Sequence, residues 1–490
     1  MLKEKVFKMM AIGAMLVATN GVHADEAVTM PVLKVTMSQP VKKNMDYCNG
    51  SIELTDGDGN VTKSYAKIKT RGATAQQYLM KPSLNVKFYS DEACTTKADL
   101  SLLGIREDSK YILDAMAIDR ICMRNRVCMD VWNDYSKLPY ETKYNQRSGT
   151  EGRFVEVYIN DEYKGIYCMS DEINRKLLNL EKYKKGIKGI LYKSGTEDIS
   201  NQNSRNFTDD YLAATITWHN AWELKYPDDY VDDHADYTAW VPLIDFYDNL
   251  TSYSKQKKYF YMANLVDYQL QVMAMSLQDN FGDKNHFLSI RDASQDIDDS
   301  DASKANMRKF IVSPWDLDTS LGGAFDGSYY NGTYSNWTVK DVAKKGFRPF
   351  DQFQGQSEYK AALKARWIEL RTKTYAVDSI NKRLDTYRDL FINSGAWKRM
   401  TDHWNSVSSS KPKYVNDLDT ELSYIKDWYK ARFAEMDSYF GIETTGIESV
   451  NAPVDTDETK EQVIYNLQGQ RLSAIPEKGY FILNGKKYCK

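Results

Sequence analysis

The feature of the sequence that most restricts its fold is a change in the spacing of apolar residues. Between residues 50 and 170, apolar and polar side chains alternate, as in Leu84, Val86 and Phe88, with Lys87 on the opposite face. This period of two is typical of half-buried β-strands. A second alternation over 155–159 runs into a turn and another strand, which predicts an antiparallel hairpin.

From residue 172 onward the spacing favours helices. Val266, Leu270, Met273 and Leu277 fall at i, i+4, i+7 and i+11, so they share one helical face. Helical spacing is also expected over 108–135 and 424–440. Short strands are expected over 287–290 and 310–312, on either side of the acidic stretch 292–304. The sequence therefore predicts an α+β fold with a strand-rich N-terminal part and a helix-rich C-terminal part.

The length of 490 residues implies more than one lobe, because a single core stops growing near about 250 to 300 residues. We expect the main domain over 25–445. A polar linker without periodicity follows over 446–461, and a small β-strand tail occupies 462–490.

Residues 1–24 have the pattern of a secretory signal peptide. Lysines at 3, 5 and 8 precede an apolar stretch over 9–18, and small residues flank a cleavage point before Asp25. About ten apolar residues are too few for the ~20 of a spanning helix. We therefore expect a protein exported to the outside or to the cell surface, with no membrane span.

Charge and cysteine content exclude several classes of protein. The net charge of −3 lacks the basic excess of a nucleic-acid binder, so no nucleic acid partner is expected. None of the six cysteines forms a C-x-x-C pair, which argues against structural zinc. Most are expected to be buried thiols, although an oxidising compartment would allow a bridge between Cys48 and Cys94.

Metal-capable side chains gather at the ends of the expected hairpin around the acidic stretch. If these two strands pair, the start of the first lies beside the end of the second. The start carries Asp279, Asp283 and Asn285, and the end carries Asp316 and Asp318. Hard oxygen ligands suit Mg²⁺, Mn²⁺ or Ca²⁺. Each of these residues alone is also an ordinary turn former, but their joint placement favours chemistry.

The order Asp, Asn, hairpin, Asp is that of a phosphotransferase catalytic loop. At this point the sequence resembles the CotH family, named for a spore-coat protein and regarded as atypical protein kinases. The resemblance spans roughly 67–440 and implies a distant two-lobe kinase-like fold, ATP as phosphate donor and Mg²⁺ or Mn²⁺ as cofactor. The matching segments are 70–74, 81–88, 111–113 with Arg124 and Asn125, 154–160, 163–167 with Glu172, 279–285 and 314–318.

The resemblance implies a role for each matching polar residue. Asp279 would be the catalytic base, Asn285 a metal ligand, and either Asp316 or Asp318 the main metal-binding carboxylate; spacing does not separate the last two.

In the strand-rich part the family's basic segment matches Lys81 and Lys87. Lys87 is slightly favoured for phosphate contact, because it lies on the polar face of its strand. Glu172 would orient such a lysine, and Arg71 would contact phosphate or brace its loop. Solvated surface is the alternative for Lys87 and Glu172.

The sequence also departs from ordinary kinases, since it has neither a G-x-G-x-x-G loop nor an Asp-Phe-Gly motif. Two alternatives therefore stay open. One is an inactive surface adhesin or structural protein that binds a surface protein or glycan, and the other is a sugar hydrolase built on the acidic cluster. The acceptor of a kinase would be an unidentified protein hydroxyl.

The tail carries a second resemblance, to the C-terminal signal domain of proteins exported by the type IX route of Bacteroidota. It extends over 463–471 and 478–487 and implies placement at the cell surface. The alternative is a small β-module that caps the fold.

Overall fold

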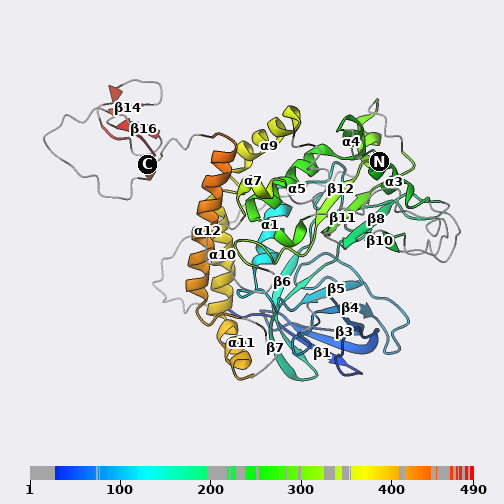
Figure 1. Ribbon diagram of the computed structural model, residues 1–490. Coiled ribbons are helices and arrows are strands. Elements are labelled where there is room, and N and C mark those ends of the chain that lie inside the picture. The colour runs from blue at the N-terminus through cyan, green and yellow to red at the C-terminus, as the bar shows by residue number, and fades with distance from the viewer. Residues whose placement is uncertain are drawn as a thin grey trace, which may run out of the picture.

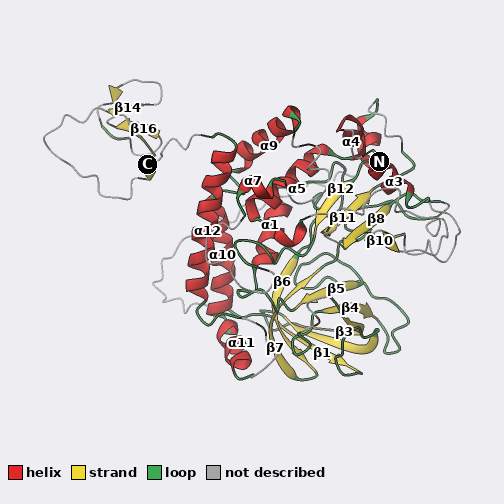
Figure 2. Cartoon of the chain, in the orientation of Figure 1, coloured by secondary structure: helices red, strands yellow, loops and turns green. Residues whose placement is uncertain are grey.

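The computed structural model combines a closed seven-stranded barrel with a five-stranded sheet and a set of helices (Figures 1 and 2). It describes residues 28–72, 76, 78–184, 186–195, 218–219, 222–227, 238–249, 253–281, 284–295, 300–324, 337–344, 353, 355–407, 412, 414–442, 448–449, 464–466, 471–472, 474–476, 480–483 and 486–489. The leader-like residues 1–24 and Asp283 lie outside this set.

The barrel has the strand order β1-β2-β3-β4-β5-β7-β6 and closes through parallel pairing of β1 with β6. Alternation points Ala66, Ile68 and Val86 into its interior, while Lys67 and Lys87 face outward. Its strands are β1 (Val32–Met37), β2 (Cys48–Thr55), β3 (Val61–Thr70), β4 (Leu84–Tyr89), β5 (Lys110–Asp114), β6 (Gly152–Ile159) and β7 (Glu162–Ser170). The predicted hairpin over 155–167 is confirmed as β6 and β7.

The second sheet has the order β12-β11-β8-β10-β9, and Figure 1 shows it above the barrel. Its strands are β8 (Ile190–Gly195), β9 (Trp218–His219), β10 (Trp222–Tyr226), β11 (Lys284–Ile290) and β12 (Ile311–Pro314). The antiparallel pair β11 and β12 confirms the predicted hairpin. The sequence prediction missed β8, β9 and β10, because these strands are short and lie in a region that was expected to be helical.

Helices cover the second sheet and run along one flank, where α10 packs on α12 and α11 on β7 (Figure 1). They are α1 (Arg124–Tyr135), α3 (Val241–Asp248), α4 (Tyr253–Tyr259), α5 (Met262–Met275), η4 (Gln278–Asn280), α6 (Ala302–Arg308), α7 (Val339–Val342), α9 (Ser357–Leu370), α10 (Val377–Asn393), α11 (Ala396–Asn405) and α12 (Leu418–Tyr439). Ser276, in the left-handed conformation at φ 52°, ends α5 just before η4.

Three expectations need correction or confirmation. The helix expected over 108–135 begins only at Arg124, because the apolar run around Ile112 forms the buried strand β5. The bridge between Cys48 and Cys94 is absent, since both are buried free thiols. The tail contains the expected strands, namely β14 (Ile464–Tyr465), β15 (Arg471–Leu472), β16 (Tyr480–Leu483) and β17 (Lys486–Cys489). A further short strand, β13 (Glu448–Ser449), lies in the segment expected to be a linker and pairs with β17.

No helix in the described ranges combines the length and the apolar character that crossing a bilayer would require.

Candidate functional site

The β11–β12 hairpin brings the two polar segments together at its open end. His286 pairs with Pro314, so the residues just beyond this pair are neighbours. The backbone N–H of Trp315 donates to the carbonyl of Asn285 at 3.0 Å. The side-chain amide of Asn280 donates to the carbonyls of both Asn285 (2.7 Å) and Trp315 (2.9 Å). Segments thirty residues apart in the sequence are thus fixed side by side.

Asp279 is held from two directions. Its Oδ1 accepts a hydrogen bond from Lys284 Nζ at 2.6 Å, and its Oδ2 accepts one from Asn285 Nδ2 at 2.7 Å. Asn285 adopts the left-handed conformation at φ 54°, which asparagine tolerates better than most residues. Its Nδ2 also donates to the Asp279 carbonyl at 3.0 Å. These contacts place the predicted base and the predicted metal ligand together, and they add Lys284, to which sequence reasoning gave no role.

Asp316 and Asp318 lie next to a third carboxylate, Asp114 at the end of β5. Burial raises the pKa of Asp316 to about 6, with a further contribution from Asp114, although the residue remains accessible to solvent. Burial and then the charges of Asp316 and Asp114 raise the pKa of Asp318 well above its usual range. We call Asp114, Asp316 and Asp318 the acidic group. Like charges brought together in this way resist ionisation unless a cation joins them.

The oxygen chemistry of this place fits a hard divalent cation that shares its coordination with phosphate oxygens. Mg²⁺ is usually held by one or two carboxylates and completes its shell with water and phosphate. Across the described part of the chain, no three His, Cys, Asp or Glu side chains gather as a metal-holding group. The ligands that suit such an ion are therefore the carboxylate of Asp316 or Asp318 and the amide oxygen of Asn285.

Asn125 links the acidic group to helix α1. Its Nδ2 donates to Asp114 Oδ2 at 3.3 Å, and its Oδ1 accepts from the backbone N–H of Leu317 at 3.2 Å. One side chain on α1 therefore contacts both the barrel strand and the loop that carries Asp316 and Asp318. Sequence reasoning matched Asn125 to the family without a role and overlooked Asp114. The signal that could have found Asp114 is an acidic residue at the end of a buried strand.

Arg71 reaches the same place from the end of β3. Its guanidinium carbon lies 5.4 Å from the centre of the Trp315 ring, and its charge opposes the rise in the pKa of Asp316. Lys193 on β8, which sequence reasoning missed, lies 5.7 Å from the same ring.

Lys87 and Glu172 lie on a basic face of the barrel but do not pair with each other. Lys67, Lys87 and Lys110 occupy directly opposed positions across β3, β4 and β5. Glu172 instead accepts from Lys110 Nζ at 2.6 Å. Lys87 Nζ lies 4.3 Å from the ring centre of Tyr47, and burial followed by the charge of Lys110 lowers its pKa.

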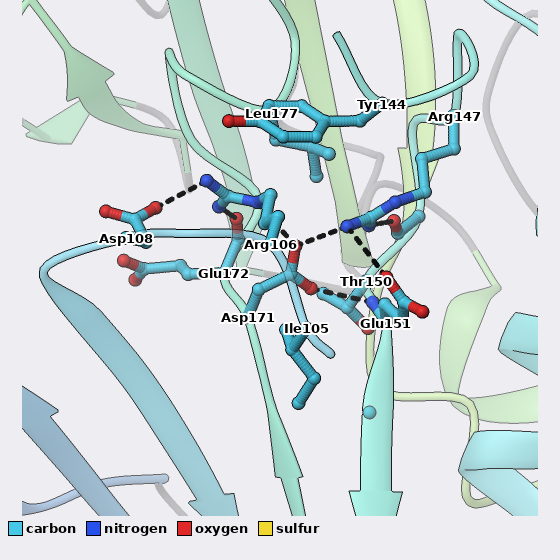
Figure 3. Close-up of polar contacts among 12 residues, drawn as sticks. Ile105, Arg106, Asp108, Tyr144, Arg147, Thr150, Glu151, Asp171, Glu172 and Leu177 are labelled. Atoms are coloured by element: carbon cyan, nitrogen blue, oxygen red, sulfur yellow. Dashed lines mark hydrogen bonds and ion pairs between the residues drawn. The ribbon is translucent and has the colours of Figure 1, made fainter. Parts of the chain in front are cut away.

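The segment before Glu172 is anchored by four residues that we call the Asp171 network: Arg106, Asp108, Arg147 and Asp171 (Figure 3). Asp171 Oδ2 accepts from Arg106 Nε at 2.6 Å and from Arg147 Nη2 at 2.8 Å. Arg106 also pairs with Asp108 at 2.6 Å. Because these side chains are almost fully buried, the network fixes the position of Glu172 at the end of β7.

Lys81 is enclosed by the protein rather than directed at the hairpin end. Its Nζ donates to the carbonyls of Ala115 (2.8 Å) and Ile166 (2.7 Å) and to the hydroxyl of Tyr414 (2.6 Å). Burial lowers its pKa to about 8. All three N–H donors have partners, so Lys81 braces the barrel against the segment before α12.

Within the described part of the chain, two surface hollows lie away from the hairpin end. One, of about 530 Å³, has Phe154, Tyr387 and Leu390 in its wall. The other, of about 430 Å³, is lined by charged residues including Arg106 and Arg147, which already have partners in the Asp171 network. Neither hollow contains a predicted site residue, so the hairpin end remains the candidate site.

A mixed α+β fold with paired Asp279 and Asn285 opposite an acidic loop is consistent with a kinase-like protein. The sequence model of the CotH kinase protein family matches residues 68–436, and the chain belongs to that family. The resemblance found from the sequence is thereby confirmed as to family. Among curated proteins, none matches this chain.

Proposed function

We propose that this protein is a secreted, metal-dependent phosphotransferase with a two-lobe kinase-like fold, which transfers the γ-phosphate of ATP to a protein hydroxyl. The observation that carries the proposal is the contact of Asp279 with Asn285 at the open end of the hairpin that also presents Asp316 and Asp318. This combination places a proton acceptor beside hard oxygen ligands, as phosphoryl transfer requires.

Each residue has a distinct part in this proposal. Asp279, held by Lys284 and Asn285, accepts the proton of the attacking hydroxyl. Both side-chain hydrogen bonds of Asn285 with described residues use Nδ2, so its amide oxygen would be available to hold a metal ion. Asp316 or Asp318 is the principal metal ligand. When bound, ATP with Mg²⁺ or Mn²⁺ supplies the phosphoryl group and the charge that offsets it.

The basic residues of the barrel take supporting parts. Arg71 is the phosphate contact nearest to the hairpin end, and Lys87 contributes to the basic face of the barrel. Glu172 orients Lys110 rather than Lys87. Lys81 has no remaining donor for a nucleotide and is left out of the phosphate site.

Placement outside the cell belongs to the same proposal. It is supported by the leader-like pattern over 1–24 and by the tail over 462–490, which resembles a type IX sorting domain. Secretion of the full chain from a host that has this export route, compared with a chain lacking 462–490, tests it.

The test of the chemistry is transfer of labelled phosphate from γ-labelled ATP, with Mn²⁺ or Mg²⁺, to the protein itself and to casein as a general acceptor. Asp279→Asn should lower the transfer rate by about 10²- to 10⁴-fold, because it removes the proton acceptor. Asp58→Asn, in an exposed turn, is the matched control and should leave the rate unchanged.

Undiminished transfer by Asp279→Asn would contradict the role of this residue. No transfer by the wild type, together with retained binding of a surface partner, would favour the inactive adhesin. Release of reducing sugar without nucleotide would favour the hydrolase.

A further inference from the structure

Two cations from different parts of the fold meet at the ring of Trp315. The guanidinium carbon of Arg71, which follows β3, lies 5.4 Å from the ring centre, and Lys193 Nζ, on β8, lies 5.7 Å from it. The ring of Phe287 packs edge-on against Trp315 at 5.5 Å and lies 6.0 Å from Lys193 Nζ. The barrel and the five-stranded sheet thus each direct one positive charge to the same aromatic side chain.

Among the residues that the structure describes, neither cation has a counter-ion in contact with it. Within the described ranges, no hydrogen bond or ion pair joins the side chain of Arg71 or of Lys193 to another residue, and both side chains are half-buried. Lys225 is close enough to Lys193 to interact with it electrostatically, but Lys225 already pairs with Glu223 at 2.9 Å. Asp316 is close enough to interact electrostatically with both cations, but it forms no ion pair with either of these two described residues. Two half-buried, unpaired positive charges are costly unless an anion lies between them.

We infer that Arg71 and Lys193 form an anion site for phosphate oxygens, to which the barrel supplies one cation and the five-stranded sheet the other. The identity of the ligand as a nucleoside triphosphate rests on the proposed function, whereas the anion site itself does not. Because its two cations belong to the barrel and to the second sheet, the bound anion also holds these two parts together.

The experiment measures binding of inorganic tripolyphosphate by calorimetry, in the presence of EDTA, to the full chain and to four variants. Lys193→Met and Arg71→Met should each raise the dissociation constant at least tenfold, because each removes one cation. Lys193→Arg should restore binding to within about threefold. Lys225→Met is the matched control and should change binding less than twofold, because Glu223 already neutralises that lysine.

Equal binding by Lys193→Met and the wild type, or no binding by the wild type, would overturn the anion site. If Lys193→Met does not fold, as judged by circular dichroism, Lys193→Gln takes its place with the same expectation. Lys193-dependent binding by a protein that transfers no phosphate would leave the anion site standing while the proposed function fails. If Lys193→Met still transfers phosphate and binds tripolyphosphate as the wild type does, the proposed function stands and the anion site fails.

Discussion

The Asp171 network and the acidic group are both assemblies of charged side chains within the protein, but they are built in opposite ways. In the network each carboxylate pairs with a guanidinium. Asp171 accepts hydrogen bonds from two of them, Arg106 at 2.6 Å and Arg147 at 2.8 Å. In the acidic group, burial and then the charge of Asp114 raise the pKa of Asp316, and burial and then the charges of Asp316 and Asp114 raise the pKa of Asp318. The first assembly is complete as folded. The second leaves like charges close together, and such unbalanced groups are common at functional sites.

The largest effect on stability is expected from breaking the network. Asp171→Asn should lower the free energy of unfolding by about 3 to 5 kcal/mol, because it leaves Arg106 and Arg147 buried without their shared counter-ion. Urea unfolding followed by tryptophan fluorescence measures this. A loss below about 1 kcal/mol would mean that the two arginines find other partners, and the contrast between the assemblies would then weaken.

An aspartate-to-asparagine substitution in the acidic group should change the free energy of unfolding in the opposite direction. Asp318→Asn removes one of several like charges, so the metal-free protein should unfold at the same urea concentration or gain about 1 kcal/mol. The Asp318→Asn protein should also lose metal-dependent phosphate transfer. A destabilised Asp318→Asn protein would show that this carboxylate is a structural residue.

The pH dependence of stability sharpens the comparison further. Burial raises the pKa of Asp316 to about 6, above the value near 4 of an unfolded chain. The folded state therefore binds this proton more tightly, and its contribution to stability is present below about pH 4 and is lost as the pH rises through 6.

Asp316→Asn should thus become progressively more stable than the wild type between pH 4 and 6, with a constant difference above that. Melting curves of both proteins without metal measure the difference. Taking the difference removes the opposing contribution of buried His286, whose pKa burial lowers to about 4. A difference that shrinks as the pH rises would refute the assignment.

The smallest effect is expected at an exposed ion pair, which serves as the reference for both assemblies. Lys63 and Glu53 pair across β2 and β3 at 2.7 Å on the barrel surface. Glu53→Gln should leave the urea midpoint unchanged, since solvent screens such pairs. A clear shift there would mean that the barrel is sensitive to any change of charge.

The open end of the hairpin was accessible from the sequence because antiparallel pairing alone brings its two segments together. That rule alone was enough to predict that Asp279 and Asn285 lie beside the segment after β12. Asp114 and Lys193 could not be found in this way, because their approach depends on how the barrel packs on the second sheet, and no local pattern encodes that contact.

The remaining differences also have physical causes. Alternation predicts the face on which Lys87 lies, but the partner of Glu172 depends on where β5 ends relative to β7. The run around Ile112 is too short for periodicity to separate a buried strand from a helix. Lys81 matched a family segment, yet its final partner Tyr414 lies 333 residues further along the chain.

The parallel pairing of β1 with β6 also dictates an order of events during folding. Val32 must wait for Glu156, its partner in the closing ladder, so the barrel closes only after more than a hundred intervening residues have been synthesised. Contacts of such long sequence separation slow folding, because chain entropy is spent before they form. One edge of β1 can pair with β2 as soon as that strand follows, but the edge that faces β6 stays open until the β6 segment is available, so barrel closure is a late event.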